Sequence, residues 1–248
     1  MRSSIFAVFK KLGALVILAG VLFLPSQSLA KEGEVSIVLV GDSTVADWAQ
    51  EKPARGWGQA LPPLLATNVK VINLAICGMS TKTFPATGNW QRAIDCKPNF
   101  LLIQFGHNDS HAPTRPESTR ADEDYTTNLE RYISEARAAG IFPVLITPMH
   151  RRMFDREGKP TEELGPYAEA MRRVAKKLQV PLIDLYQSSG ALLTSLGESG
   201  SASLTVSDQD RTHFTAEGAN AMAKLVIEGM RAANPELART VRTNLPTQ

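Results

Sequence analysis

Several features that define particular classes of protein are scarce or absent in this sequence. Only 6% of the 248 residues are aromatic and only two are cysteine, which is too few for a small disulfide-stabilised scaffold. The chain contains no collagen-like or other internal repeat, no low-complexity tract and no glycine- and serine-rich linker. Because 43% of the residues are hydrophobic and 21% are charged, the composition excludes a disordered chain and predicts one globular core.

The sequence also lacks a basic run. Without Arg2, Lys10 and Lys11 near the N-terminus, 24 Lys and Arg residues stand against 25 Asp and Glu residues. A chain that is nearly neutral offers no electrostatic footprint for nucleic acid or for an anionic membrane surface. We therefore expect a small molecule or a neutral polymer as ligand, and no nucleic-acid or membrane partner for the mature chain.

A long hydrophobic run is present only at the N-terminus. A basic start that ends at Lys11 is followed by the apolar residues 12–24 and by the small-residue ending Ser28-Leu29-Ala30, which is the layout of a signal peptide. A membrane anchor is the alternative, but thirteen apolar residues fall short of the roughly 20 that a spanning helix needs. We predict a signal peptide over residues 1–30, cleavage after Ala30, a secreted or periplasmic protein, and a single domain over residues 31–248.

After residue 30, short β-branched runs alternate with helical patterns, which is typical of βαβ organisation. The runs are mostly apolar, as expected for a parallel sheet that is covered on both faces. We predict five strands, at residues 36–40, 69–73, 100–104, 143–147 and 181–183. Apolar residues three and four positions apart predict core-facing helices within residues 129–136, 164–178 and 219–230. The fold class is therefore α/β, with Thr215 as the predicted cap of the last helix.

Two long segments, 106–121 and 148–161, follow the third and fourth predicted strands and show no helical pattern. In an open parallel sheet, ligands bind beyond the carboxyl ends of the strands, where these segments begin. Loops of this length in a compact domain are usually functional or mobile. We expect the functional site at this edge of the sheet.

The candidate catalytic residues come from both ends of the chain. Ser43 follows the first predicted strand in the run Gly41-Asp42-Ser43, and Asp210 and His213 precede the last predicted helix. A serine hydroxyl is a poor nucleophile unless a base takes its proton, and the base needs a group that fixes its tautomer. We predict Ser43 as the nucleophile, His213 as the base and Asp210 as the group that orients the base.

Acyl transfer also needs hydrogen-bond donors where negative charge develops on the carbonyl oxygen. The backbone N–H of Ser43 is one candidate, and Gly78 and Asn108 after the second and third strands are the others. Each motif alone is also found as an ordinary turn or helix cap. Their joint placement at strand ends and at a helix start on one rim favours an active site.

Together these motifs resemble those of the SGNH (GDSL-type) hydrolases, and more narrowly the rhamnogalacturonan and pectin acetylesterase-like branch. The resemblance covers nearly the whole chain after residue 30. It is carried by five blocks in order: Gly-Asp-Ser-Thr-Val-Ala from Gly41, Gly-Trp-Gly from Gly56, Asn-Leu-Ala-Ile-Cys-Gly from Asn73, Phe-Gly-His-Asn-Asp from Phe105 and Asp-Arg-Thr-His-Phe from Asp210.

The resemblance implies a three-layer α/β/α sandwich of flavodoxin-like type, with Ser43, Asp210 and His213 as catalytic residues. It implies that Ser43, Gly78 and Asn108 form the oxyanion hole, that no metal or cofactor takes part, and that the enzyme removes acetyl groups from a plant cell-wall polysaccharide. The absence of a Gly-x-Ser-x-Gly run argues against the α/β-hydrolase fold.

Two other functions remain open. A lipase, aryl esterase or thioesterase of the same type needs an apolar acyl channel, against which the low aromatic content counts. A glycan-binding module that has lost catalysis is the alternative from another class, but Ser43, Asp210 and His213 are all present. The expected partner is therefore an acetylated polysaccharide or oligosaccharide.

One departure from the branch concerns the substrate. Many members carry Arg directly after the glycine of the second block, where this chain has Met79. Lys82, Arg151 or Arg152 are candidates to supply a cation for a uronate carboxylate, and each is alternatively an ordinary surface charge. Trp48 lies close after Ser43 and is a candidate platform for a sugar ring, because an indole face stacks on apolar sugar faces.

Two further sets of residues have more than one interpretation. Cys77 and Cys96 either form one bridge or remain as two buried free thiols, and the distance between their Cβ atoms decides which. His107, Asp109 and His111 are residue types that bind metals, but the stretch around them is irregular and no second ligand cluster accompanies it. We expect no metal there.

Overall fold

The computed structural model describes residues 33–243, and their central element is a parallel sheet of five strands. The strands are β1 (Val35–Gly41), β2 (Val69–Asn73), β3 (Phe100–Gln104), β4 (Phe142–Ile146) and β5 (Leu182–Ile183). They lie in the order β2-β1-β3-β4-β5, and every neighbouring pair is parallel. This is the flavodoxin-like order, in which the direction of winding reverses between β1 and β3. The predicted α/β class and flavodoxin-like sheet are confirmed.

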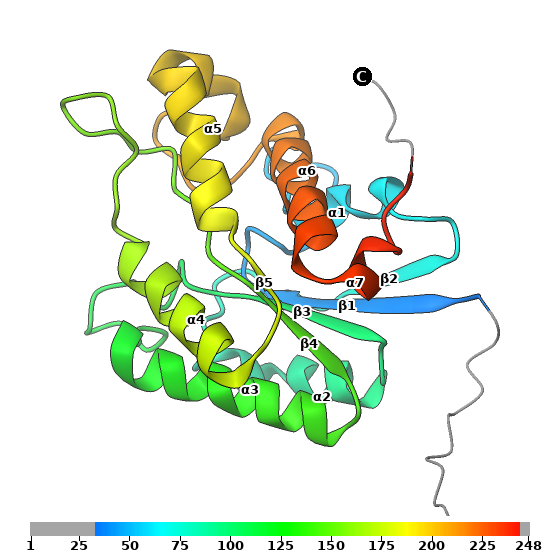
Figure 1. Cartoon of the computed structure of the whole chain (residues 1–248). Coiled ribbons are helices and arrows are strands. Elements are labelled where there is room, and N and C mark those ends of the chain that lie inside the picture. Colours follow the sequence, from blue (N-terminus) through cyan, green and yellow to red (C-terminus); the bar gives the residue numbers. More distant parts are fainter. Residues whose placement is uncertain (1–32, 244–248) are drawn as a thin grey trace, which may run out of the picture. The chain divides into compact units, whose positions relative to one another are not determined.

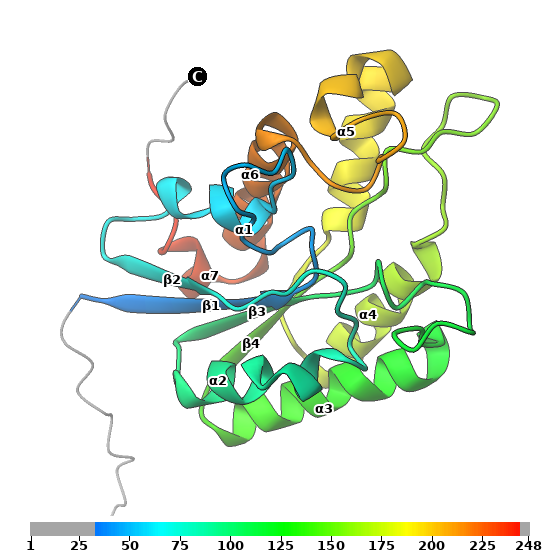
Figure 2. The ribbon, with the colours of Figure 1, turned by 180° about the vertical axis from the view of Figure 1, so that it is seen from behind.

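Alternate residues of each strand face opposite layers of helices, as the period of a β-strand requires. Ile37 and Leu39 of β1 face one core, and Val38 and Val40 face the other. The first core is covered by α1 (Trp57–Ala60), α5 (Leu185–Gly200), α6 (Ala216–Ala233) and α7 (Pro235–Ala238). The second is covered by α2 (Asn89–Asp95), α3 (Thr126–Ala138) and α4 (Gly165–Leu178). Figures 1 and 2 show these two groups of helices above and below the sheet.

Helix α6 shows how the sequence specifies one of these elements. Its N-cap is Thr215, whose side chain accepts a 3.2 Å hydrogen bond from the backbone N–H of Gly218, and Glu217 in the first turn complements the helix dipole. The apolar stripe from Ala219 to Met230 is buried against the sheet. The predicted cap and the predicted stripe are both confirmed.

Short helical turns complete the chain. They are 3₁₀ turns at Pro62–Leu64, Phe84–Thr87 and Ala202–Leu204, and a π-helical turn at Ala121–Tyr125. The sequence did not predict α2 or α5. In α5 the apolar residues are interrupted by Gly190 and Gly197, and the backbone of Gly197 departs from helical geometry.

Three predictions concern features of the chain as a whole. The predicted signal peptide lies outside the described residues. Cys77 and Cys96 are unpaired and both are exposed, so the structure has neither the bridge nor two buried thiols. Within residues 33–243, no helix combines the length and the apolar character that crossing a bilayer requires.

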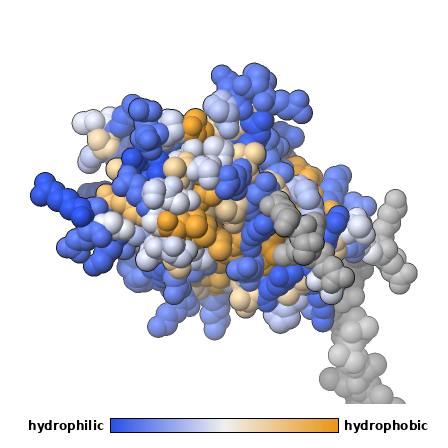
Figure 3. All heavy atoms as spheres, turned by 90° about the horizontal axis from the view of Figure 1, so that it is seen from above, coloured by the Kyte–Doolittle hydropathy of each residue, from blue (hydrophilic) through white to orange (hydrophobic). Residues whose placement is uncertain are grey.

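The long loops after β3 and β4 lie on the same side of the sheet, on the left in Figure 1 and on the right in Figure 2. Seen from above, hydrophilic residues make up most of the outline of the molecule, and hydrophobic residues gather in the middle of this face (Figure 3). Within residues 33–243, the large hydrophobic side chains that stay exposed are Phe142, Met153 and Leu196, and they come from separate segments. The carboxyl edge of the sheet is therefore the place to examine for a site.

Candidate active site

The chain leaves β1 through a turn that holds Ser43 at the carboxyl edge of the sheet. A Cβ at Gly41 would lie 2.6 Å from the carbonyl of Gln104 on β3, so this position needs glycine. The buried carboxyl of Asp42 accepts hydrogen bonds from the backbone N–H of Thr44 (2.9 Å) and from its hydroxyl (2.7 Å). This local Asx turn fixes the conformation of the chain around Ser43.

Two buried side-chain hydrogen bonds in series attach this turn to the core. The amide of Gln104 donates a 2.8 Å hydrogen bond to the hydroxyl of Thr44, and the indole N–H of Trp57 donates a 2.7 Å hydrogen bond to Gln104. The sequence analysis missed this network. The signal was a polar residue at the end of the apolar strand β3, because a buried polar side chain must find a partner.

Ser43, His213 and Asp210 form one hydrogen-bonded line. The hydroxyl of Ser43 lies 2.9 Å from Nε2 of His213, and Nδ1 of His213 lies 2.9 Å from Oδ2 of Asp210. Because Nδ1–H donates to the carboxylate, Nε2 is left to accept the serine proton. Burial opposes ionisation of Asp210, but hydrogen bonds from the ring and the backbone of His213 outweigh it and lower the pKa of this carboxyl.

Trp48 contacts both Ser43 and His213. Its indole N–H donates a 2.9 Å hydrogen bond to the carbonyl of Ser43, and its ring meets the imidazole of His213 edge to face, with the ring centres 5.3 Å apart. The side chain is half-buried. These contacts place Trp48 beside the reacting groups, and the stacking of a sugar on its face stays a prediction.

The order of the strands places Gly78 and Asn108 on the two sides of Ser43, because β2 and β3 both neighbour β1. The side-chain amide of Asn108 donates one 2.9 Å hydrogen bond to the carbonyl of Met79 and keeps its second N–H free of that bond. In residues 33–243, no acceptor is bonded to the backbone N–H of Ser43 or of Gly78. These N–H groups therefore remain available to a ligand.

A buried carboxyl joins the loops that carry these donors. Asp109 Oδ1 accepts hydrogen bonds from the backbone N–H of Thr81 (3.1 Å), from its hydroxyl (2.5 Å) and from the hydroxyl of Thr119 (3.0 Å). Burial raises the pKa of Asp109 to about 7, although these hydrogen bonds act in the opposite direction. The loop after β2 is thus fixed against the loop after β3.

His107, Asp109 and His111 do not converge on one point. Nδ1 of His107 lies 3.5 Å from Oδ2 of Asp42, whereas Nδ1 of His111 lies 2.7 Å from a carboxylate oxygen of Glu117. Burial lowers the pKa of His107 and favours its neutral form. Among the residues that the structure describes, no group of three or more His, Cys, Asp and Glu side chains is arranged to hold a metal ion.

The two arginines after β4 make internal contacts. Arg151 donates one hydrogen bond to the hydroxyl of Thr212 (2.5 Å) and another to the carbonyl of His107 (3.0 Å), so it bridges the loops on both sides of the site. Its side chain is 17% exposed. Its predicted role as a substrate cation has no support in these contacts.

Arg152 differs from both interpretations suggested by the sequence. Its side chain is only 2% exposed, so it is neither a surface charge nor within reach of a substrate. Its guanidinium donates hydrogen bonds to Thr205 (2.7 Å) and Asp208 (2.6 Å), which precede Asp210 in the chain. Arg152 therefore supports the loop that carries Asp210.

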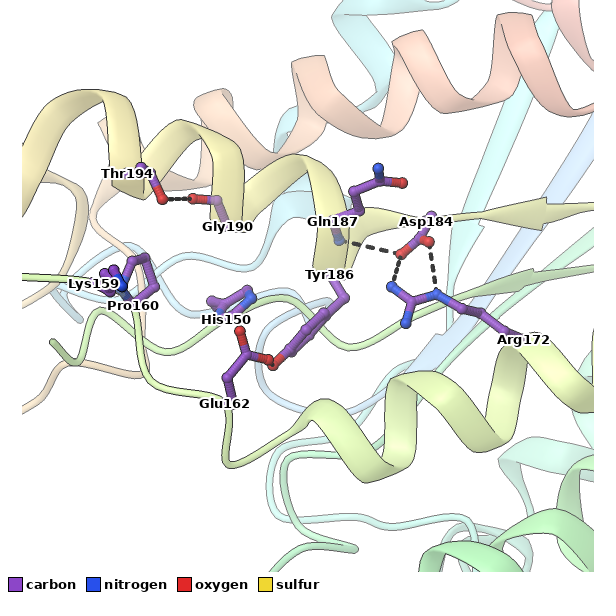
Figure 4. A pocket seen from close by; sticks show the side chains of 10 residues that line it. All are labelled: His150, Lys159, Pro160, Glu162, Arg172, Asp184, Tyr186, Gln187, Gly190 and Thr194. Atoms are coloured by element: carbon purple, nitrogen blue, oxygen red, sulfur yellow. Dashed lines mark hydrogen bonds and ion pairs between the residues drawn. The ribbon is translucent and has the colours of Figure 1, made fainter. Parts of the chain in front are cut away.

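A cavity of about 620 Å³ lies beside the loop after β4, between α4 and α5 (Figure 4). The charged groups that line it have hydrogen-bond partners, and Lys159 finds its partner in Glu157 outside the lining. The guanidinium of Arg172 donates to both oxygens of Asp184 (2.8 and 2.9 Å), and the hydroxyl of Tyr186 donates to Glu162 (2.5 Å). The pair of Arg172 with Asp184 joins α4 to the N-cap of α5.

A hydroxyl, an imidazole and a carboxylate in one line, with free N–H groups beside the hydroxyl, define a class of protein on this sheet: the serine ester hydrolases of the three-layer α/β/α type. Residues 39–221 match the GDSL-like Lipase/Acylhydrolase family. This chain belongs to that family, and the resemblance inferred from its motifs is confirmed.

Curated relatives match most of the chain. The rhamnogalacturonan acetylesterase RhgT of Bacillus subtilis is 37% identical over 211 residues, which cover 79% of this chain and 89% of the relative. The probable rhamnogalacturonan acetylesterase YesY of the same organism is 38% identical over 213 residues, which cover 83% of this chain and 96% of the relative.

Solved structures share the fold. A Bacillus subtilis protein that is 27% identical superposes with a TM-score of 0.72 over 80% of this chain, although the match spans only 56% of that longer chain. An acetylxylan esterase of Geobacillus stearothermophilus is 18% identical and has a TM-score of 0.60, over 87% of this chain and all of that one.

Proposed function

We propose that this protein is a serine carbohydrate esterase that removes O-acetyl groups from a plant cell-wall polysaccharide of the rhamnogalacturonan or pectin type. The observation that carries the proposal is the line from Ser43 through His213 to Asp210, with hydrogen-bond distances of 2.9 Å at both steps. Two relatives at 37% and 38% identity, which bear the name rhamnogalacturonan acetylesterase, support this choice of substrate.

The first half of the reaction transfers the acetyl group to the enzyme. Nε2 of His213 takes the proton of Ser43 while the serine oxygen bonds to the acetyl carbon, and the carbonyl oxygen becomes an oxyanion. The backbone N–H groups of Ser43 and Gly78 and the amide of Asn108 stabilise this oxygen. The bond from the acetyl carbon to the sugar oxygen then breaks, and the imidazolium gives its proton to that oxygen.

The second half releases acetate. His213 takes a proton from a water molecule while the water oxygen bonds to the acetyl carbon of the acetyl-serine, and the same donors again stabilise the oxyanion. The bond to the serine oxygen breaks, and His213 returns the proton to Ser43. Asp210 keeps Nδ1 protonated throughout and stabilises the imidazolium that forms in each half.

The proposal is tested by acetate release from acetylated rhamnogalacturonan, pectin and xylan, measured beside a series of p-nitrophenyl esters of increasing acyl length. We expect acetate from the first two polymers, a preference for the acetyl ester in the series, and loss of both activities in Ser43→Ala. A silent polymer panel with a strong preference for long acyl chains would instead support a lipase-like enzyme. Unchanged acetate release by Ser43→Ala would exclude the proposed mechanism.

We also propose that the protein acts outside the cytoplasm after cleavage at Ala30. The basic start, the apolar residues 12–24 and the small-residue ending Ser28-Leu29-Ala30 support this proposal. The mass of the mature protein isolated from the medium or the periplasm tests this proposal, and an uncleaved chain retained in the cytoplasm would contradict it.

A further inference from the structure

A second cavity of about 620 Å³ lies between the loops that follow β2 and β3 and the N-terminus of α4. Its lining includes Lys82 and His111. Lys82 lies three residues after Met79, and His111 lies three residues after Asn108. Three residues span at most about 11 Å, which bounds these two separations. The hydroxyls of Thr119 and Tyr167, which also line the cavity, donate to Asp109, the residue after Asn108. These contacts place the cavity beside the loops that carry the oxyanion donors.

The position of Lys82 relative to the reacting groups is fixed by hydrogen bonds. Thr81, the preceding residue, donates to the buried carboxyl of Asp109 through both its backbone N–H and its hydroxyl. The backbone N–H of Lys82 itself donates to the hydroxyl of Ser80 (3.2 Å). Since Asp109 directly follows Asn108, the lysine and the oxyanion site belong to one rigid unit.

The charges of this cavity differ from those of the cavity in Figure 4. In the cavity of Figure 4, Lys159 pairs with Glu157 at 3.1 Å and Arg172 pairs with Asp184. In the cavity beside the oxyanion donors, the exposed Lys82 ammonium has neither a hydrogen-bond acceptor nor a carboxylate partner within residues 33–243. The cation is therefore available to a ligand.

The remaining lining is suited to a sugar. Arg120 adds a second cation, whose guanidinium pairs with Glu123 outside the lining, and Asp124 is the one carboxylate among the lining residues. Nδ1 of His111 is bonded to Glu117, which leaves Nε2 for a ligand. The rings of Pro166 and Tyr167 supply apolar surface against which the carbon face of a pyranose packs.

We propose that this cavity is a subsite for the carboxylate of a uronic-acid residue of the substrate polymer, with Lys82 as its principal cation. The proposal rests on the proposed function, because it concerns the same polymer. It takes up the cation that the sequence analysis sought for a uronate and assigns it to Lys82 rather than to Arg151 or Arg152.

The test compares Lys82→Gln with wild type on acetylated rhamnogalacturonan and on the same polymer after its carboxyl groups have been reduced to alcohols. We expect the variant to raise KM for the charged polymer about fivefold at low salt, which is the scale of one exposed ion pair. On the reduced polymer the two proteins have similar KM values, and Lys82→Arg restores the wild-type KM on the charged polymer. Equal effects on both polymers, or no effect on either, would overturn the proposal.

Lys159→Gln is the matched control, because it removes one positive charge from a cavity of the same volume elsewhere on the protein. We expect its KM for the charged polymer to equal that of wild type. A rise as large as that of Lys82→Gln would mean that the effect comes from the net charge of the protein, and would overturn the subsite.

A binding measurement separates failure of the subsite from failure of the proposed function. Calorimetric titration of Ser43→Ala with trigalacturonate, which carries no acetyl group, requires no turnover. We expect binding that weakens about fivefold when Lys82→Gln is added. If acetate release from the polymers fails but this difference is present, the proposed reaction is wrong and the subsite stands. If trigalacturonate does not bind, or binds both proteins equally, the subsite is wrong whatever the reaction.

Discussion

The backbone N–H of Arg152 donates a 2.8 Å hydrogen bond to the carbonyl of Arg211, which lies between Asp210 and His213 in the chain. The loop after β4 is thereby joined to the loop that carries the orienting carboxylate and the base. The position of the imidazole relative to Ser43 therefore depends on residues far from it in the sequence.

Replacing Asp210 by Asn removes the negative charge that stabilises the imidazolium of His213 and lets an amide N–H face Nδ1, so the tautomer of His213 is no longer fixed. We expect kcat on p-nitrophenyl acetate to fall by about three to four decades, with a much smaller change in KM. Asp208→Asn is the control on the same loop, since an amide oxygen still accepts the hydrogen bond from Arg152. Steady-state kinetics of both variants check this prediction, and equal losses in kcat would contradict it.

Gly78 has a φ of +80°, and a Cβ at this position would meet no atom within 4 Å. We expect Gly78→Ala to lose about 1 kcal/mol of unfolding free energy through backbone strain, and to lose kcat because relief of that strain turns its N–H away from the oxyanion. Gly140→Ala is the matched control, with a φ of +75° and equally open space at the turn between α3 and β4. Urea unfolding and kinetics test both; a similar loss of kcat in Gly140→Ala would contradict the assignment.

Arg151→Met breaks the bridge between Thr212 and His107. Methionine replaces only the unbranched stem of the arginine and lacks its hydrogen-bonding nitrogens. We expect kcat to fall about tenfold to a hundredfold at nearly constant KM, because small displacements of a catalytic group are costly. Arg151→Lys should restore part of the rate. Arg172→Met, which breaks the ion pair to Asp184 in the cavity of Figure 4, is expected to lower stability and leave kcat unchanged. A rise in KM without loss of kcat in Arg151→Met would indicate direct contact with substrate instead.

The pKa of Asp109 predicts a pH dependence of stability. Burial raises this pKa to about 7 in the folded protein, so the folded state binds a proton that the unfolded state has already released above about pH 4. The unfolding free energy therefore falls as pH rises from about 4 to 7, by an amount on the order of 4 kcal/mol.

Asp109→Asn isolates this contribution, since an amide does not titrate. We expect the unfolding free energy of wild type to fall relative to that of the variant as pH rises over this range. Urea unfolding of both proteins at pH 5, 6, 7 and 8 measures it. A difference that stays constant with pH would show that the carboxyl of Asp109 keeps the same charge in both states.

The strands were predictable because buried strands of a parallel sheet are continuous apolar runs. Residues 69–73 and 100–104 were predicted to the residue, and β4 begins one residue earlier than predicted. The predicted approach of Ser43 to His213 followed from chain order and from the rule that sites lie beyond the carboxyl ends of strands. Both predictions need only local sequence patterns and the order of the elements along the chain.

Long-range polar contacts were not predictable in the same way. The burial of Arg152 depends on Thr205 and Asp208, which lie more than fifty residues away, and no local pattern distinguishes it from the adjacent Arg151. Helix α5 escaped prediction because its glycines break the apolar stripe. In both cases, contacts made by the folded chain outweigh local preference.

The edge-to-face contact of Trp48 with His213 gives the molecule a built-in optical indicator. Indole emission depends on what surrounds the ring, so a substitution that moves the imidazole of His213 away from Trp48 is expected to change this emission without any substrate. Trp57 and Trp90 are buried beside Gln104 and Glu135 and supply a steady background. The emission of Trp48 would therefore report whether the base still lies against this indole, even in a Ser43→Ala protein that turns nothing over.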